Sequence, residues 1–185
     1  KNYQRAINAL ATAPGEERND KLITDALAQI TLANNKSLQA KTLIADVLKK
    51  RDAALRANAD TMANNDWQSG EKLLKSLTSD IERGRLTEPP ALQRRSSVVI
   101  AAFDKAELDA LTNQLLIRAR GAEALASFGN AEKLAPKTFR SAEQSLQAAI
   151  LSMQQYRYEN AEAMGLADQA ESEFKHATQL TLMAQ

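Results

Sequence analysis

Apolar residues recur at spacings of three and four along most of the chain, as they do on one face of an α-helix. The first third is predicted to form a short helix over 2–12, a polar turn over 12–19 and a helical stretch over 20–63. Four polar residues at 34–37 interrupt the apolar stripe of that stretch. One continuous helix and two helices separated at this point are equally favoured.

The same spacing predicts four more helices, two short and two long, in the rest of the chain. They are a short helix 67–83 closed by Gly84, a long helix from about 91 to 134 ended by Pro136, a short helix 139–154, and a long helix 158–183. Residues that can cap helix starts stand before the predicted helices, namely Asn19 or Asp20, Asp66, Thr87 and Thr138. The segment 98–103 is apolar almost all round, which predicts burial on several sides.

One stretch of the chain occurs twice. Residues 58–74 align without a gap with residues 130–146, at an offset of 130 − 58 = 72 residues. Six positions are identical, and Trp67 in the first copy corresponds to Phe139 in the second. Two copies are fewer than the roughly three that a solenoid needs, so the repeat indicates a duplicated helical unit.

The predicted corners between long and short helices carry the motif that the two copies share. Each aromatic residue is expected to fill the corner where a long helix gives way to a short one; exposure for recognition is the alternative. The residues of this structural corner motif are Trp67, Gly70, Leu74, Pro136, Phe139, Ala142, Leu146 and Tyr158.

Composition supports helices throughout. Only 6 Gly and 4 Pro interrupt 185 residues, and aromatic residues are 4% of a chain rich in alanine, the strongest helix former. The predicted fold is all-α: an elongated antiparallel bundle of alternating long and short helices with an internal duplication. Residues 1–185 are expected to form one elongated domain, with repeat-like units at about 38–102 and 110–175.

Charge and cysteine content exclude several classes of function. The net charge of +1 lacks the basic excess of a nucleic-acid binder, and the chain has no cysteine for disulfides or thiolate catalysis. No uncharged apolar run approaches the roughly 20 residues that span a bilayer, so no transmembrane segment is expected. The chain begins with Lys1, without Met or a visible signal peptide, which suggests a processed or trimmed form.

No catalytic, metal-binding or cofactor-binding motif is apparent. His176 is the single histidine and is expected to suit the C-terminal dipole of its helix. The carboxylate groups and basic clusters are expected to lie on solvated helix faces; they are Glu16–Glu17, Asp104/Glu107/Asp109, Glu171/Glu173, Lys49–Arg51 with Arg56, Arg94–Arg95 and Arg118/Arg120. We therefore expect no enzyme activity and no cofactor.

The second copy resembles a known pattern. Leu134-Ala135-Pro136, then Phe139, Ala142 and Leu146, then Tyr158 and Ala161 resemble an uncharacterised alanine-rich helical domain family of bacterial envelope proteins. The likeness covers about 131–172 and, more faintly, 59–102. The chain departs from the family pattern before Tyr158, where the glycine is missing. Members of this family are often lipoproteins, and some precede an OmpA-like peptidoglycan-binding domain.

The resemblance implies a scaffold in the periplasm or at the outer membrane, and a cytoplasmic location remains the alternative. We expect a structural or adaptor module that docks protein partners, with envelope components as the candidates, through apolar stripes at the ends of the bundle. The alternative is a helical ligand-binding domain with a groove between its long helices. An enzyme is the third possibility.

Overall fold

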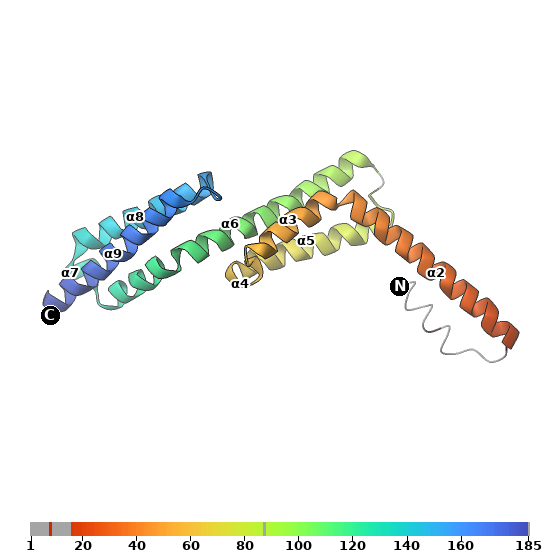
Figure 1. The fold of residues 1–185 in the computed structure, drawn as a ribbon, viewed down its shortest axis with the longest axis horizontal. Coiled ribbons are helices and arrows are strands. Elements are labelled where there is room, and N and C mark those ends of the chain that lie inside the picture. The colour runs from red at the N-terminus through yellow and green to blue at the C-terminus, as the bar shows by residue number, and fades with distance from the viewer. Residues whose placement is uncertain (1–7, 9–15, 87, 185) are drawn as a thin grey trace. The chain divides into compact units, whose positions relative to one another are not determined.

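The computed structural model describes residue 8, residues 16–86 and residues 88–184 (Figure 1). Every regular element in these ranges is an α-helix, which confirms the all-α prediction. The short helix predicted over 2–12 and the cap predicted at Thr87 lie outside the described residues, apart from Asn8. The helices are α2 (Glu16–Leu43), α3 (Ala45–Arg56), α4 (Ala59–Met62), α5 (Asn64–Glu82), α6 (Pro89–Phe128), α7 (Ala131–Leu134), α8 (Pro136–Gln155) and α9 (Ala161–Ala184).

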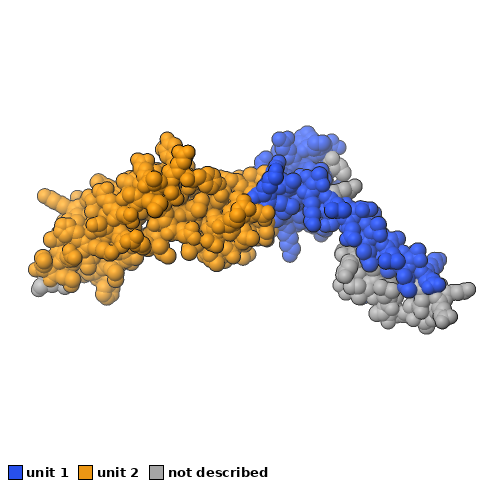
Figure 2. Space-filling model, in the orientation of Figure 1, with its two compact units in different colours: residues 1–49, 72–99 blue, residues 50–71, 100–185 orange. Residues whose placement is uncertain are grey.

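The chain divides into two compact units (Figure 2). Unit 1 comprises residues 1–49 and 72–99, and unit 2 comprises residues 50–71 and 100–185. Helices α3, α5 and α6 each contribute residues to both units. These boundaries differ from those of the repeat-like units predicted above, which stay a prediction.

In unit 1, α2 continues unbroken through residues 34–37, so the one-helix alternative is correct at that point. The stretch 20–63 as a whole is nevertheless three helices, because the chain turns at Ile44 and again before α4. Helix α2 already begins at Glu16, so the turn predicted over 12–19 and the caps predicted at its end are wrong there. Helix α2 ends at Leu43. The next residue, Ile44, is buried, and so is Val47 in α3; they are 4% and 0% exposed.

The end of α5 follows the prediction. Gly84 takes the left-handed conformation with φ of 66°, which a residue without a Cβ adopts at little cost. The Arg85 N–H donates to the Asp80 carbonyl, and the Gly84 N–H donates to the Ile81 carbonyl. This pair of hydrogen bonds is a Schellman motif, which satisfies carbonyls at the helix end.

Unit 2 contains two corners with the same backbone geometry. Asn58 and Asn130 both adopt the left-handed conformation, with φ of 57° and 63°, and each precedes a helix of four residues. The chain then breaks at Ala63 and at Ala135, whose φ and ψ are −138° and 45° in the first corner and −133° and 51° in the second. Asparagine tolerates the left-handed region better than most residues, which explains its place at both turns.

These corners correct several predicted helix ends. The long helix α6 ends at Phe128 instead of Leu134, because the turn at Asn130 reverses the chain first. Pro136 does not end that helix; it opens α8 at the first helical position, where its missing N–H costs no hydrogen bond. The predicted caps are wrong too, since Thr138 lies inside α8 and Asp66 lies inside α5. Helix α9 begins at Ala161 instead of Tyr158.

The core of unit 2 lies between the second half of α6 and the helices α8 and α9, which pack against each other (Figure 1). The apolar stripe predicted for the last helix is buried, namely Ala163, Ala167, Ala170, Phe174, Ala177 and Thr181. Alanines let the helix backbones approach closely, so many small contacts replace a few large ones. The segment 98–103 buries only one face: Val99 and Phe103 are buried, whereas Val98 and Ala101 are exposed.

Candidate functional site

The corner motif places its two aromatic rings in equivalent surroundings. Trp67 is 6% exposed, and its ring centroid lies 5.4 Å from that of Phe103. Phe139 is 4% exposed, and its centroid lies 5.2 Å from that of Phe174. Tilted and edge-on ring pairs at this separation are favourable contacts beyond the area that they bury.

Other residues of the motif support these rings. Ala142 and Leu146 are buried in the α8–α9 core, while Leu74 is half-buried and Pro136 is exposed. The Arg51 guanidinium lies 5.0 Å from the Trp67 ring centroid and donates from Nε to Glu71 Oε1 at 2.5 Å. The corner residues therefore form packing contacts between helices.

Gly70 is required by the close approach of Phe103. A Cβ at Gly70 would lie 2.7 Å from the nearest carbon of the Phe103 ring, closer than packed carbon atoms allow. We expect Gly70→Ala to destabilise the protein by about 1–2 kcal/mol in urea unfolding, because overpacking exceeds the gain in helix propensity. The matched control is Gly121→Ala, since a Cβ there has no neighbour within 4 Å. The control should stabilise by about 0.5–1 kcal/mol, and equal effects of both changes would contradict the close contact.

A cluster of charged side chains joins three segments of unit 2. We call it the charged corner, and its members are Lys50 of α3, Asp104 and Glu107 of α6, and Arg157 and Tyr158 of the connection between α8 and α9. Arg157 donates to both carboxylate oxygens of Asp104, at 3.1 and 3.0 Å. Lys50 Nζ lies 2.6 Å from Asp104 Oδ1 and 3.1 Å from Glu107 Oε2.

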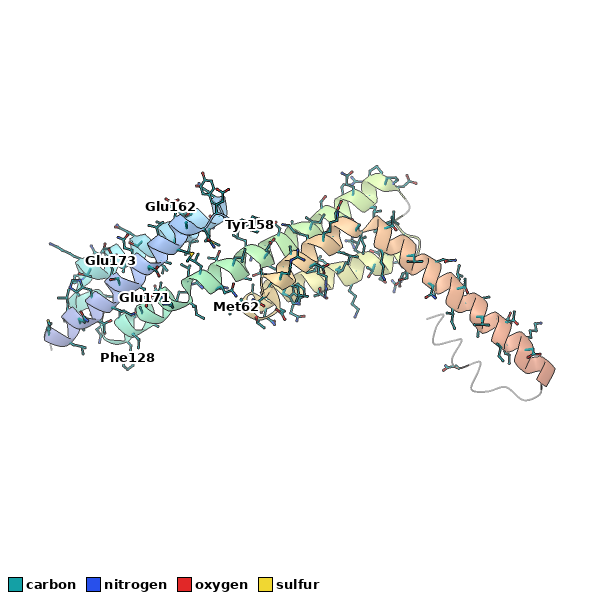
Figure 3. The ribbon with its side chains drawn as sticks, viewed as in Figure 1. Met62, Phe128, Tyr158, Glu162, Glu171 and Glu173 are labelled. Atoms are coloured by element: carbon teal, nitrogen blue, oxygen red, sulfur yellow. The ribbon has the colours of Figure 1, made fainter. Side chains whose placement is uncertain are left out.

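Glu107 is the buried member of the charged corner, with 3% of its surface exposed. Its Oε1 accepts a 2.6 Å hydrogen bond from the Tyr158 hydroxyl, and its Oε2 lies 3.5 Å from Arg157 Nη1. The Tyr158 side chain is labelled in Figure 3. A buried carboxylate is tolerated when opposite charges and hydrogen bonds satisfy it, and here both oxygens have partners. Glu107 therefore links α6 to α3 and to the connection between α8 and α9, and both of its carboxylate oxygens are occupied by these contacts.

The pKa values follow these contacts. Burial raises the pKa of Asp104, but hydrogen bonds from Arg157 and Lys50 outweigh burial and hold the pKa below its ordinary value of 3.8. Burial lowers the pKa of Lys50, yet its hydrogen bonds to Asp104 and Glu107 raise it above 10.5 overall. The hydrogen bond to Glu107 raises the pKa of Tyr158 above 10.0. Asp104 and Lys50 are therefore charged, and the Tyr158 hydroxyl protonated, over a wide pH range.

The depressed pKa of Asp104 predicts an acid-sensitive contribution to stability. Because the folded pKa lies below the unfolded one, the contribution is complete above about pH 4 and is lost as pH falls through the folded pKa. We expect the difference in unfolding free energy between wild type and Asp104→Asn to be constant above pH 5 and to shrink below pH 4. Urea unfolding at a series of pH values measures it. A difference that persists unchanged to about pH 2 would contradict the ion pairs of Asp104.

No protein-family model, curated protein or solved structure matches this chain. The contacts within the described residues are therefore the basis for a functional proposal. No group of three or more His, Asp or Glu side chains among the described residues is placed to hold a metal ion. No helix within the described ranges combines the length and apolarity needed to cross a membrane.

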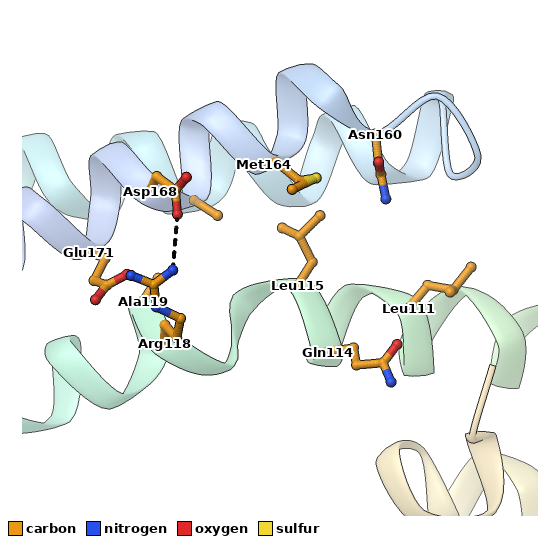
Figure 4. A pocket seen from close by; sticks show the side chains of 10 residues that line it. Leu111, Gln114, Leu115, Arg118, Ala119, Asn160, Met164, Asp168 and Glu171 are labelled. Carbon is orange, nitrogen blue, oxygen red and sulfur yellow. Dashed lines mark ion pairs between the residues drawn. The ribbon is translucent and has the colours of Figure 1, made fainter.

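A cleft of about 320 Å³ lies between α6 and α9 in unit 2 (Figure 4). Leu111, Leu115 and Met164 provide its apolar lining. At one end, Arg118 Nη2 lies 2.8 Å from Glu171 Oε2, and Arg118 Nη1 lies 3.6 Å from Asp168 Oδ1. The charged groups at this end of the cleft are paired with one another.

A second cleft, of about 290 Å³, lies beside the charged corner. Its lining comprises Ala53 and Arg56 of α3, Ala57 directly after that helix, Glu107 and Leu111 of α6, and Tyr158. Leu111 also lines the first cleft, so the two adjoin. Neither brings together a nucleophile with a general base or a pair of opposed free carboxylates, which are the arrangements that hydrolytic chemistry requires.

The prediction of solvated charges is wrong at several positions. Glu107 and Glu171 are buried, and Lys50 and Arg51 are engaged in ion pairs. Glu171 pairs with Arg118 and with Lys175, whose Nζ lies 2.6 Å from Glu171 Oε1. Burial of Glu107 had a signal in the sequence, because it falls within the apolar stripe formed by Phe103, Ala106 and Ala110.

Several other charged residues are exposed, as predicted, and others have side chains that the structure does not describe. Lys49, Arg94, Arg95, Arg118 and Arg120 are exposed, as predicted. His176 is exposed on α9. The side chains of Glu16 and Glu17 lie outside the described residues.

Proposed function

We propose that the protein is a non-enzymatic docking scaffold, a helical spacer that presents apolar surface to protein partners. The observation that carries this proposal is an exposed apolar surface in unit 2, where α6 ends and α9 makes its last turn. We assign four exposed residues to it, Leu125 and Phe128 of α6 and Leu182 and Met183 of α9, which are 67%, 90%, 69% and 85% exposed, and we call it the tip surface. The two helices are neighbours here, since a Cβ at Gly129 would lie 3.8 Å from Thr181.

Phe128 is the most exposed large apolar residue among the described side chains. It projects from the end of α6, away from the α9 ribbon in Figure 3. A cluster of apolar side chains held in water is unfavourable unless a partner covers it, and such patches are typical of protein interaction sites. The buried charges support the same function, because the charged corner stabilises helix contacts and offers no reactive group.

Site-specific crosslinking tests the docking function. Phe128 is replaced by the photoreactive p-benzoylphenylalanine, which keeps the phenyl ring, in cells that produce the protein naturally. We expect one discrete crosslinked product, and its loss when Leu125→Asp is added to disrupt the surface. The matched control carries the same photoreactive residue at Gln147, an exposed position within α8. No product at 128, or the same products at 128 and 147, would contradict docking through the tip surface.

We also propose that the protein is located in the bacterial envelope, in the periplasm or at the outer membrane. The support is the resemblance of residues 131–172 to the alanine-rich helical domains of envelope proteins. Fractionation of cells that produce the natural protein tests it. Recovery of the protein with the cytoplasmic fraction alone would exclude this location.

We propose in addition that the scaffold is an elongated, internally duplicated bundle. Its support is the shared geometry of the corners at Asn58 and Asn130, each followed by a helix of four residues and then by a longer one. Small-angle scattering tests the shape, because a compact chain of this length has a radius of gyration of about 16 Å. We expect a clearly larger value for the monomer, and a value near 16 Å would exclude elongation.

Binding of a small amphipathic ligand is the second candidate function. It is favoured by the α6–α9 cleft, whose volume of about 320 Å³ reaches the lower end of the range for ligand pockets. Titration with 8-anilinonaphthalene-1-sulfonate tests it, with Leu115→Trp as the variant that fills the cleft. Saturable binding of one probe that this variant abolishes would support the ligand function, and unsaturable or unchanged binding would exclude it.

A further inference from the structure

Helix α2 carries an exposed apolar stripe that is separate from the tip surface. Ile23, Leu27 and Leu38 are 43%, 59% and 62% exposed, and Ile30 between them is half-buried. At 100° per residue these four positions fall within about 80° of one another around the helix axis. Among the described side chains of α2, Ala26 is the one that is buried. Ile23, Leu27 and Leu38 are therefore available to a partner helix.

The charges at the two ends of this stripe have opposite sign. Asp20 lies at its start and Lys41 at its end, and both side chains are exposed. Neither forms an ion pair with another of the described residues. By helical spacing Lys41 falls on the stripe, and Asp20 falls at its edge, at the same angle around the helix axis as Leu38. A partner that fits this surface should carry a basic group opposite Asp20 and an acidic group opposite Lys41.

A second α2 in the antiparallel direction satisfies this requirement at a single register. We place the two-fold axis at the point between residues 30 and 31. Each residue of one α2 then faces the residue of the second α2 whose number, added to its own, gives 61. Asp20 then faces Lys41 of the second copy, since 20 + 41 = 61. Ile23 faces Leu38 in the same register, since 23 + 38 = 61. One register therefore pairs Asp20 with Lys41 and also pairs Ile23 with Leu38, and its two-fold symmetry forms each pair twice.

The parallel direction is disfavoured by the same charges. It would set Asp20 against Asp20 and Lys41 against Lys41 of the second copy, and like charges in contact are repulsive. In the antiparallel register Asn34 faces Leu27, since 27 + 34 = 61. Thr31 likewise faces Ile30, since 30 + 31 = 61. Polar residues within an apolar seam cost stability but disfavour other registers, as a single one does in coiled coils.

We propose that α2 is a self-association surface, which pairs antiparallel with α2 of a second copy of this chain at the register in which opposite residue numbers sum to 61. The proposal rests on α2 alone. It does not depend on the tip surface, so the two proposals can fail separately.

Cysteine crosslinking tests the direction and register of pairing. The chain has no cysteine of its own, so introduced thiols report without background. We expect the double variant Ile23→Cys/Leu38→Cys to form a covalent dimer under mild oxidation, whereas either single variant stays monomeric in denaturing gels. A disulfide within one helix is impossible, because 15 residues of helix separate the two positions by about 22 Å. A covalent dimer from Ile23→Cys alone would indicate parallel pairing, and no dimer from the double variant would exclude this register; either result overturns the proposal.

Charge reversal tests the same register without covalent trapping. Asp20→Lys and Lys41→Asp are each expected to weaken self-association about tenfold in sedimentation equilibrium, because each change turns two attractive pairs into repulsive ones. The double variant Asp20→Lys/Lys41→Asp restores both pairs with exchanged signs and should return to the wild-type association constant. The control is Asp25→Lys, an exposed position on the opposite side of α2, which should leave association unchanged. A wild-type protein that is monomeric up to millimolar concentration, or no recovery in the double variant, would overturn the proposal.

Discussion

Replacing Phe139 by alanine is expected to destabilise the protein by about 3–4 kcal/mol, the largest effect of any single truncation proposed for this chain. Phe139 is 4% exposed and meets Phe174, which is fully buried, in an edge-on contact at 5.2 Å. The alanines around the two rings cannot extend to fill the space, so the cavity should stay open. Urea unfolding followed by circular dichroism measures the change.

Phe128→Ala is the control for this prediction. It removes the same side chain from a position that is 90% exposed, so its effect on unfolding should stay within about 0.5 kcal/mol. Trp67→Ala should resemble Phe139→Ala, because Trp67 is buried against Phe103 in the first corner. Effects of Trp67→Ala and Phe139→Ala no larger than that of Phe128→Ala would contradict the structural role of both corners.

Neutralising Glu107 is expected to have the largest effect of any change to a charged residue, a loss of about 2–3 kcal/mol in Glu107→Gln. The variant keeps the shape of the side chain but leaves Lys50 and Arg157 with a single carboxylate, that of Asp104, to share. Breaking a buried ion pair usually costs about 3–5 kcal/mol, and the remaining Asp104 contacts should reduce the loss. Glu143→Gln on the exposed surface of α8 is the matched control and should change stability by less than 0.5 kcal/mol.

Coupling between Glu107 and Tyr158 provides a sharper test of the same corner. The Tyr158 hydroxyl donates to Glu107 Oε1, so Tyr158→Phe removes the hydrogen bond and little else. In a double-mutant cycle with Glu107→Gln, the two effects should be less than additive. Strict additivity would mean that the contact contributes nothing to stability. The Tyr158 contribution should be complete below about pH 10 and should be lost only as pH rises through the folded pKa, because the hydrogen bond to Glu107 raises that pKa above 10.0.

Helix boundaries show where sequence reasoning was sufficient and where it failed. Gly84 was predicted as the residue after α5 because only glycine enters the left-handed region at little cost. The end of α6 was placed at Pro136, whereas the chain turns at Asn130 and Pro136 opens the next helix. Asparagine is permissive in this region without requiring it, so its position alone did not distinguish a turn from a polar helix surface.

The candidate site shows the same division. The alanine seam of α9 and the burial of Trp67 and Phe139 followed from local spacing and from the large apolar area of the rings. The charged corner did not, because Lys50 and Arg157 are separated by more than one hundred residues along the chain. A run of charges shows that ion pairs are available, but their partners depend on which helix faces meet.

The sequence by itself determined that the chain is helical and which residues line the seam of its last helix. These properties depend on local propensity and on the 3.6-residue period, both of which are readable over a few turns. The tertiary structure was needed to bring Arg157 and Tyr158 onto Asp104 and Glu107, and to leave the tip surface and the α2 stripe exposed. Exposure and ion pairing are relations between distant segments, so they become defined only when the helices pack.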